Sequence, residues 1–323
     1  MRLLGFQIPN FTYPGVPNDR LFEQIVTLAT AAERGGFDSV YVMDHLYQIR
    51  GVGPHTDPML EGYTLLGGLA ARTTRVRLGT LVSGVTYRNP AFLAKVVTTL
   101  DIVSSGRAIC GIGAAWNEDE HRGYGYEFPP VGERLSRLEE ALQIIRAMFR
   151  EDAPSFSGRY YRIEHALNVP RPVQPNGPPI LIGGGGEQRT LKLVAQYADM
   201  CNFFGDVATV RHKLDVLQRH CEAVGRDPNT IIKTRLGSLI IRGTDAEAER
   251  ALERRMKVPG VNPEWVRFGY IVGGPERVSE QVQKFLDVGL DGMIFNMPHV
   301  GDPEAIELAG KTLARLGQPA AVR

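Results

Sequence analysis

Two polar side chains, Asp44 and His45, directly follow a short apolar run at residues 39–43. In a barrel of parallel strands the carboxyl ends of the strands face the reaction chamber, so an acid and an imidazole there are placed for chemistry. Histidine titrates near neutral pH and can donate or accept a proton. The same pair can also act structurally, as a cap for the next helix, and the two residues alone leave both interpretations open.

A run of glycines forms the second candidate site. The apolar segment 180–182 is followed by Gly183, Gly184, Gly185 and Gly186, and then by Glu187. Glycine lets backbone N–H groups approach an anion, and the start of the helix expected next adds unpaired donors. The run has neither the Gly-Lys-Ser/Thr of a Walker loop nor the spacing of a dinucleotide fingerprint. A tight turn without a ligand is the alternative, but four glycines exceed what one turn requires, so we favour a phosphate site.

Two more expected strand ends carry small residues. Residues 78–80 end in Thr80 and lead to Leu81 and Val82, while residues 111–115 lead to Trp116 and Asn117. Small side chains in the second stretch leave room for a flat ring, and Trp116 and Asn117 offer stacking and hydrogen bonds. On these residues alone, a structural role is at least as good an account of either stretch.

Other kinds of catalytic site find little support in the sequence. The seven histidines form no HxH pair and no HExxH helix, so a metal-dependent hydrolase is not indicated. No GxSxG nucleophile elbow is present. Lys233 lies near an expected strand but at the wrong end for Schiff-base chemistry.

These side chains need a scaffold, and the chain alternates short apolar segments with amphipathic helical stripes. That alternation is typical of a parallel sheet with helical crossovers. Strands are expected at residues 3–8, 39–43, 76–82, 108–112, 179–182, 200–203, 234–241 and 292–296. We predict an α/β architecture, a single (β/α)8 TIM barrel over residues 1–323, although periodicity alone does not exclude an open sheet.

Three connecting segments, 47–57, 116–132 and 155–177, are longer than a minimal barrel needs. The first two follow strand ends, so we expect them to be insertions at the C-terminal face of the barrel. Their aromatic and imidazole side chains either line the mouth of the site or pack on one another: Tyr47, His55, Trp116, His121, Tyr124 and Phe128.

Composition and charge narrow the class of protein. The chain carries 37 basic and 36 acidic side chains, a net charge of +1, so nothing points to nucleic acid or a membrane as a partner. No apolar run approaches the roughly 18 residues of a membrane span, and the N-terminus is apolar too briefly for a signal peptide. The three cysteines are widely spaced and form no CxxC, and this odd, sparse count argues against a disulfide framework and indicates a reducing compartment. We therefore predict a cytoplasmic protein.

Taken together, the motifs resemble the luciferase-like monooxygenase superfamily, and within it the oxidoreductases that depend on the deazaflavin coenzyme F420. The matching stretches are 36–40, 44–45, 78–80, 87–90, 111–118, 179–186, 197–199 and 273–276. The resemblance covers residues 3 to 316, nearly the whole chain. It implies a (β/α)8 barrel with the cofactor ring in the C-terminal mouth and the phosphate-bearing tail near the loops after strands five and six.

Carried over by position, the resemblance also implies roles for individual residues. His45 is implied as the acid/base beside the ring, with Asp44 as its neighbour against the cofactor. Cofactor contacts are implied for Thr80, Leu81, Val82, Asn117, Gly183, Gly184, Gly185, Gly186 and Glu187. A non-prolyl cis peptide, frequent in the family at the end of strand three, is expected at 81–82 or 82–83. Some F420 enzymes place lysines near the phosphate, but residues 202–205 offer none, which leaves Arg189 or Lys192 as candidates.

The resulting hypothesis is hydride transfer between C5 of reduced F420 and an unidentified small organic substrate, with His45 supplying or taking the accompanying proton. An FMN-dependent monooxygenase of the same superfamily is the closest alternative, because FMN shares the flat tricycle and the phosphorylated tail. A non-catalytic cofactor-binding barrel is a further alternative. The resemblance also implies a homodimer.

Overall fold

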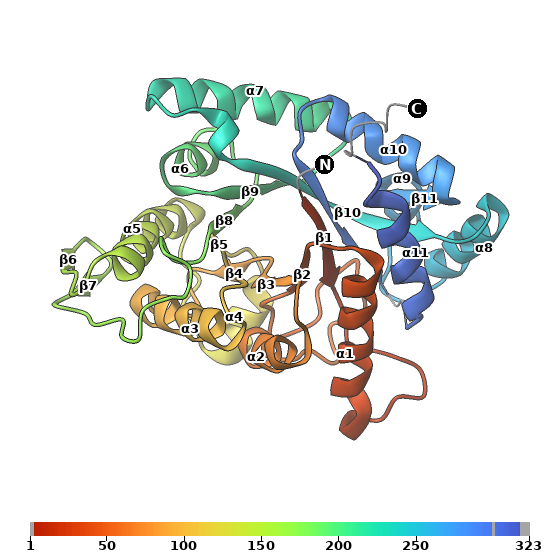
Figure 1. Ribbon diagram of the computed structural model, residues 1–323, viewed down its shortest axis with the longest axis horizontal. Helices are drawn as coiled ribbons and strands as arrows, with labels where there is room; N and C mark the ends of the chain where they lie inside the picture. The colour runs from red at the N-terminus through yellow and green to blue at the C-terminus, as the bar shows by residue number, and fades with distance from the viewer. Residues whose placement is uncertain (1–2, 299–300, 317–323) are drawn as a thin grey trace.

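The computed structural model describes residues 3–298 and 301–316. In it, parallel strands close into a barrel with helices around it, as predicted (Figure 1). In barrel order the strands are β1 (Leu3–Ile8), β2 (Ser39–Val42), β3 (Arg77–Thr80), β5 (Ala108–Gly113), β8 (Ile180–Gly183), β9 (Met200–Phe203), β10 (Ile232–Ile241) and β12 (Gly292–Asn296). The barrel closes because β10 pairs with both β9 and β12, and β12 pairs with β1.

The predicted strand 76–82 is shorter in the structure. Regular pairing with β2 stops at Thr80, and the chain then forms β4 (Ser83–Gly84), which pairs with β5 instead. In contrast, β10 begins at Ile232, two residues before the predicted start, and runs to Ile241 as predicted. The other barrel strands lie within a residue or so of their expected positions.

Alternate strand residues fill the interior of the barrel. One buried cluster takes a residue from each of six strands: Leu3, Tyr41, Ile109, Leu181, Met200 and Ile294. Successive residues of a strand point to opposite faces, so their neighbours along each strand face the surrounding helices and join the main apolar core. Because the interior is packed with side chains, the site must lie at the mouth of the barrel.

The helices that cover the barrel present buried stripes to it. They are α1 (Asn18–Gly35), α2 (Gly62–Arg72), α3 (Pro90–Val103), α5 (Val131–Arg150), α6 (Thr190–Tyr197), α7 (Val207–Ala223), α10 (Pro275–Asp287) and α11 (Pro303–Leu313). In α1 the buried side chains include Leu21, Ile25 and Leu28, which recur at helical spacing. Gly36 then ends α1 with φ of 99°, a conformation that favours glycine.

Several elements were not predicted from the sequence. They are the hairpin β6 (Phe156–Ser157) and β7 (Arg162–Ile163), the short helix α4 (Glu118–Tyr124), the 3-10 turn η1 (Pro228–Thr230), and α8 (Asp245–Met256), α9 (Pro263–Gly269) and β11 (Tyr270–Gly273). The last three form an insertion after β10, and β11 pairs with the end of that strand. β11 was not predicted because it is only four residues long, too short to show the alternation of a strand.

The insertion and the loop 47–57 together build one side of the rim of the barrel. Arg255 of α8 donates to the backbone carbonyl oxygens of Gly51 and Val52 at 2.9 Å each. These hydrogen bonds join positions more than 200 residues apart in the chain. In the described ranges 3–298 and 301–316, each helix is too short or too polar to cross a membrane.

Candidate active site

A cavity of about 370 Å³ lies at the carboxyl ends of β2, β3, β5 and β8. Residues on its wall that the sequence singled out are Asp44, His45, Leu81, Val82, Gly183, Gly184, Gly185 and Gly186. The structure therefore brings the imidazole and the glycine run to the same cavity, which is the condition for both to act on one ligand.

Three predicted cofactor contacts do not lie on the wall of this cavity. Thr80 is fully buried, and its hydroxyl donates to the carbonyl oxygen of Gly111 at 3.1 Å. Asn117 stands at the N-terminus of α4 and lines a second cavity farther out. The carboxylate of Glu187 accepts from Nζ of Lys213 at 2.5 Å. Contacts between a cofactor and any of the residues named from the sequence stay predictions.

The His45 imidazole is held by a buried carboxylate. Its Nδ1 lies 2.7 Å from Oε1 of Glu120, whose side chain is 0% exposed. The second oxygen, Oε2, accepts from the backbone N–H groups of Leu46 at 2.7 Å and Tyr47 at 3.3 Å. The hydroxyl of Tyr87 donates to Oε1. Because Nδ1 is engaged, Nε2 is the ring nitrogen left for a reacting group.

Glu120 is ionised in spite of its burial. Burial alone raises the pKa of this carboxyl, but hydrogen bonds from His45, Tyr87 and the Leu46 backbone outweigh it and hold the pKa below its usual value. A carboxylate beside the ring keeps a proton on Nδ1 and balances the charge that forms when Nε2 takes a proton. Sequence reasoning missed Glu120 because it stands in a run of three acidic residues, 118–120, that no local signal tells apart.

Asp44 is engaged by a guanidinium. Nη1 and Nη2 of Arg88 donate to its two oxygens at 2.5 and 3.0 Å, and Nη2 also donates to Glu61 at 2.6 Å. Burial alone lowers the pKa of Arg88, but the contacts with Asp44 and Glu61 outweigh it and raise the pKa. The guanidinium also lies over the ring of Tyr63, 5.0 Å from its centroid. With both oxygens occupied, Asp44 shapes the wall beside His45 and is not a free base.

Glycines on two strands make room for Val82. A Cβ added at Gly183 would lie 2.8 Å from Cγ2 of Val82, and one added at Gly113 would lie 2.9 Å from it, closer than real side chains approach. The peptide bond Leu81–Val82 is cis, at one of the two positions expected from the resemblance. Gly184 has φ of 121°, which side chains disfavour. These glycines therefore serve both the backbone conformation and the close packing of the wall.

A cation beside the glycine run comes from α7. A Cβ added at Gly185 would lie 3.7 Å from Cε of Lys213, whose ammonium is paired with Glu187. Of the two cations considered from the sequence, Arg189 donates to the backbone of α5 at 2.7 Å and Lys192 is exposed. Neither lines the cavity. Lys213 was not foreseen, because a lysine in the middle of an amphipathic helix carries no sign of its neighbours in space.

The sequence matches the family model described as luciferase-like monooxygenase over residues 4–270. The chain belongs to the luciferase-like monooxygenase family. It is 30% identical over 324 residues to the F420-dependent glucose-6-phosphate dehydrogenase of Nocardia farcinica, a match that covers 90% of this luciferase-like chain and 93% of the relative.

Solved structures of other proteins share the fold of this luciferase-like chain. The monooxygenase RslO1 from Streptomyces bottropensis superposes with a TM-score of 0.80 at 22% identity, covering 97% of this chain and 98% of that one. An F420-dependent secondary alcohol dehydrogenase in complex with an F420-acetone adduct also gives 0.80, at 19% identity, covering 97% and 99%. At these identities the matches establish the barrel fold alone.

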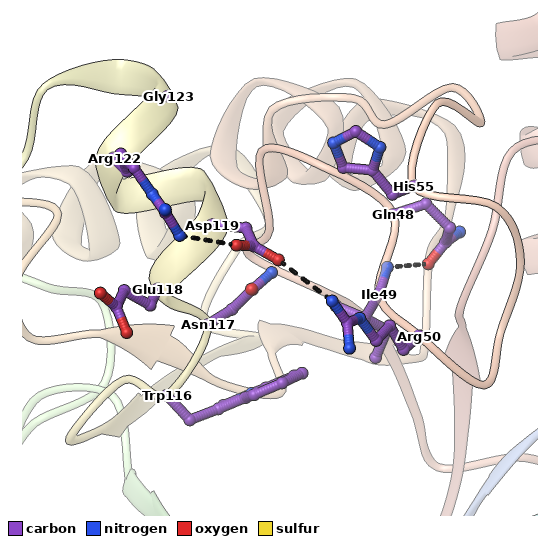
Figure 2. A pocket seen from close by; sticks show the side chains of 10 residues that line it. All are labelled: Gln48, Ile49, Arg50, His55, Trp116, Asn117, Glu118, Asp119, Arg122 and Gly123. Atoms are coloured by element: carbon purple, nitrogen blue, oxygen red, sulfur yellow. Dashed lines mark hydrogen bonds and ion pairs between the residues drawn. The ribbon is translucent and has the colours of Figure 1, made fainter.

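A second cavity of the luciferase-like barrel, about 760 Å³ in volume, lies between the loop after β2 and helix α4 (Figure 2). Arg50 and Asp119 approach one another from its two sides, with Nη2 and Oδ2 3.8 Å apart. Trp116 lines both this cavity and the first one, and its ring meets His45 edge-on with centroids 5.5 Å apart. Trp116 is therefore a wall that the two cavities share.

The aromatic residues considered for the mouth divide into two groups. His55 and Trp116 line the outer cavity. The other four pack on neighbouring rings, Tyr47 on Tyr124 with centroids 5.6 Å apart and His121 on Phe128 with centroids 4.8 Å apart. His55 belongs to both groups, because its ring also meets Tyr47 edge-on with centroids 5.2 Å apart. Within residues 3–298 and 301–316, no three His, Cys, Asp or Glu side chains come together as a metal site.

Proposed function

We propose that this protein is an F420-dependent oxidoreductase that transfers a hydride between reduced coenzyme F420 and a small organic substrate, with His45 as the acid/base. The observation that carries the proposal is the single cavity shared by His45 and the glycine run. A cofactor with a flat ring and an anionic tail would place its ring beside His45 and its tail at the glycine run, so both must line the same cavity. The names of relatives, an F420-dependent glucose-6-phosphate dehydrogenase among them, support this choice of cofactor.

The residues present fit a flat ring with a phosphorylated tail. Val82 packs so closely against Gly113 and Gly183 that side chains at these glycines would not fit, and both glycines line the cavity, where the lack of side chains leaves room for a ring. At the other end, the glycine backbone at Gly185 and Gly186 suits a phosphate, whereas the N–H of Gly184 already donates to the carbonyl oxygen of Asn202 at 3.3 Å. Lys213 lies beside this run but is paired with Glu187 and does not line the cavity. When bound here, F420 supplies the hydride chemistry, which no side chain of the protein can provide.

The chain's own part is to place and move a proton. With Nδ1 bound to Glu120, His45 gives or takes the proton at Nε2, on the substrate side. The buried Glu120 holds the orientation of the ring and balances the transient positive charge. Asp44, fixed by Arg88, keeps the adjoining wall in place.

Titration of the purified apoprotein with F420 and with FMN tests the cofactor. We expect saturable binding of F420 with a higher affinity than that of FMN, followed by F420-dependent turnover of organic substrates. Tight binding of FMN without binding of F420 would make the protein an FMN-dependent monooxygenase instead. Binding of F420 without turnover across a broad substrate panel would leave a non-catalytic carrier.

We also infer a homodimer located in the cytoplasm. The homodimer is supported by exposed apolar side chains on α3, where Phe92 is 60% and Val103 is 49% exposed. Such side chains on one helix face are typical of an interface between chains. The cytoplasm is supported by the three cysteines, which are buried and unpaired: Cys110, Cys201 and Cys221.

A further inference from the structure

The buried carboxylate of Glu120 has a donor at each of its four acceptor positions. Nδ1 of His45 and the hydroxyl of Tyr87 share Oε1, and the backbone N–H groups of Leu46 and Tyr47 share Oε2. A carboxylate offers about four lone-pair sites, so Glu120 is fully engaged. Three of the donors belong to consecutive residues, 45–47, whereas the fourth, Tyr87, comes from the segment between β4 and α3. Nothing in the proposed hydride step assigns a role to Tyr87.

The ring of Tyr87 is packed so that its hydroxyl reaches Glu120. A Cβ added at Gly84 would lie 2.9 Å from Cε2 of Tyr87, closer than real side chains approach, so the glycine leaves room for the ring. The ring also lies against that of His121, with centroids 4.9 Å apart. Tyr87 lines the cavity of about 370 Å³ at the mouth of the barrel. The phenol is therefore a fixed part of the wall of the candidate active site.

The segment that carries Tyr87 is joined to α4 at two consecutive positions. Oγ1 of Thr86 lies 2.6 Å from Nε2 of His121, next to the bond between Tyr87 and Glu120. Nδ1 of His121 lies 2.6 Å from the carbonyl oxygen of Asn117, at the start of the same helix. Because two neighbouring residues of the segment bond two neighbouring residues of α4, a shift of the helix would break both bonds. This pairing fixes Glu120 relative to Tyr87.

The other charged and titratable groups around Tyr87 are engaged elsewhere. Arg88 is bound to Asp44 and Glu61, and the buried His121 is engaged at both ring nitrogens. Burial, followed by the hydrogen bond to the carboxylate, raises the pKa of the Tyr87 hydroxyl. The phenol therefore keeps its proton in the neutral range and acts as a donor, not as a second base.

Two donors on one carboxylate oxygen compete for its negative charge. While Oε1 of Glu120 accepts from Tyr87, it has less charge to offer to the Nδ1–H of His45. Glu120 is then a weaker base and leaves the proton on Nδ1. It also stabilises the imidazolium less, so Nε2 of His45 releases its proton more readily.

We propose that Tyr87 is a positioning residue that acts through Glu120, keeping the proton of the pair on Nδ1 of His45 and making Nε2 a weaker base. Tyr87 exchanges no proton with a substrate itself, because its hydroxyl proton is held by the carboxylate. The role of Tyr87 in proton transfer rests on the proposed function, whereas its effect on the imidazole is a property of the apoprotein.

NMR titration of the apoprotein measures this effect directly. The chain has seven histidines, so ¹³Cε1-labelled histidine gives a simple spectrum in which the His45 signal is identified by its loss in His45→Asn. We expect the titration midpoint of His45 to lie about 0.5–1 pH unit higher in Tyr87→Phe than in the wild type, because the imidazolium gains a stronger partner. A midpoint that is unchanged or lower in Tyr87→Phe would overturn the proposal.

Tyr126→Phe is the matched control. The ring of Tyr126 lies 5.8 Å from that of Tyr87, but its hydroxyl is not among the four donors to Glu120. The titration midpoint of His45 should therefore equal that of the wild type. Tyr87→Phe keeps the ring that packs against Gly84 and His121, so circular dichroism should show a folded protein.

A second variant establishes whether the effect passes through the carboxylate. Glu120→Gln keeps an acceptor oxygen but removes the charge, so the titration midpoint of His45 should fall below that of the wild type. Adding Tyr87→Phe to Glu120→Gln should change the midpoint by less than about 0.3 pH unit, because the charge on which the hydroxyl acts is gone. A shift of full size in the double variant would show that Tyr87 acts by another route, and the proposal would fail.

The same titration of the F420-loaded protein separates this proposal from the proposed function. We expect the higher midpoint of Tyr87→Phe to be retained when the cofactor is bound. A difference that is present in the apoprotein and disappears on loading would exclude Tyr87 from the reaction. If the wild type does not bind F420, the proposed function is refuted, and the apoprotein titrations still decide whether Tyr87 acts on His45 through Glu120.

Discussion

The His45 ring is fixed through one nitrogen before any substrate arrives. Nδ1 is bound to Glu120 at 2.7 Å, and the edge contact with Trp116 limits rotation of the ring. Glu120 is in turn fixed by the backbone N–H groups of Leu46 and Tyr47, the residues that follow His45. The orientation of the imidazole is therefore set by its own loop through a distant carboxylate. An acid/base group held this way needs little reorganisation when the proton moves.

Replacement of the imidazole tests its role directly. We expect His45→Ala to lower kcat by about 10²- to 10⁴-fold, the usual contribution of a general acid/base, because the proton must then come from water. The affinity for F420 should stay within a few fold, since the glycine wall is untouched. His165→Asn, on an exposed loop with φ of 45°, is the matched control and should turn over like the wild type. Unchanged turnover in His45→Ala would remove His45 from the mechanism.

Glu120 also makes stability depend on pH. Its folded pKa lies below its usual value of 4.5, so its stabilising effect is fully present above pH 4.5 and is lost as pH falls through the lowered folded value. Glu120→Gln should lose about 1–3 kcal/mol of unfolding free energy at pH 7, the cost of weakened buried hydrogen bonds. Urea unfolding at pH 7 and pH 3.5 should show the gap between variant and wild type narrowing at the lower pH. A gap that widens on acidification would contradict this assignment.

At the scale of elements, the barrel strands were predictable because each is a short apolar run between helical stripes. Strands such as Leu3–Ile8 and Met200–Phe203 are buried along their whole length, and composition alone reveals that state. The insertion after β10 was not predictable, because β11 is held by pairing with the end of β10 and not by a pattern of its own. Local sequence does not carry information about such partners.

The residues of the candidate site also divide into some that the sequence predicts and others that it does not. His45 and the glycine run could be found because both follow strand ends, and parallel strands of a barrel present those ends on one face. Glu120 and Lys213 could not be found, because each matters through a neighbour that is distant in sequence. Nothing in the local pattern of a charged residue says whether it will be buried, paired or exposed.

The glycine run offers a test at the scale of one element. A Cβ at Gly185 meets only Lys213, at 3.7 Å, and its φ lies outside the region that strains a side chain, so Gly185→Ala should fold as well as the wild type. The added methyl group lies on the cavity wall and should weaken F420 binding by about 1–3 kcal/mol, or roughly 10- to 100-fold. Gly132→Ala, in open space on α5, is the matched control. Equal F420 affinity in the two variants would refute the phosphate cradle.

At the scale of the whole molecule, the three cavities lie along one rim of the barrel and share walls. The third, of about 820 Å³, lies between β10, the loop after β9 and the insertion α9–β11. Trp116 lines all three cavities, and Phe204 lines both the His45 cavity and the third one. Their other walls come from segments separated by most of the chain, from the loop after β2 to the end of β12. A closed barrel makes such a site possible, because it turns eight successive loops toward one opening.

An apolar surface on the outside of the barrel, over α2 and α3, has no role in the candidate active site. A groove of about 430 Å³ between these helices is lined by Phe92, Val96 and Val103, and Arg88, which holds Asp44, lies at its edge. An apolar groove of this kind is expected to be covered in a homodimer, which also shields the ion pair behind the active-site wall.

Phe92→Asp should therefore convert the protein to monomers, because it places a charge where two apolar surfaces meet. Light scattering coupled to gel filtration gives the mass of each species directly. Phe268→Asp is the matched control, since this aromatic side chain is more exposed, at 83%, but lies at the rim of the barrel and away from α3. A monomeric wild type at micromolar concentrations, or a Phe92→Asp variant that stays dimeric, would show that this face is not the interface. Dissociation by Phe92→Asp alone assigns the interface to α2 and α3.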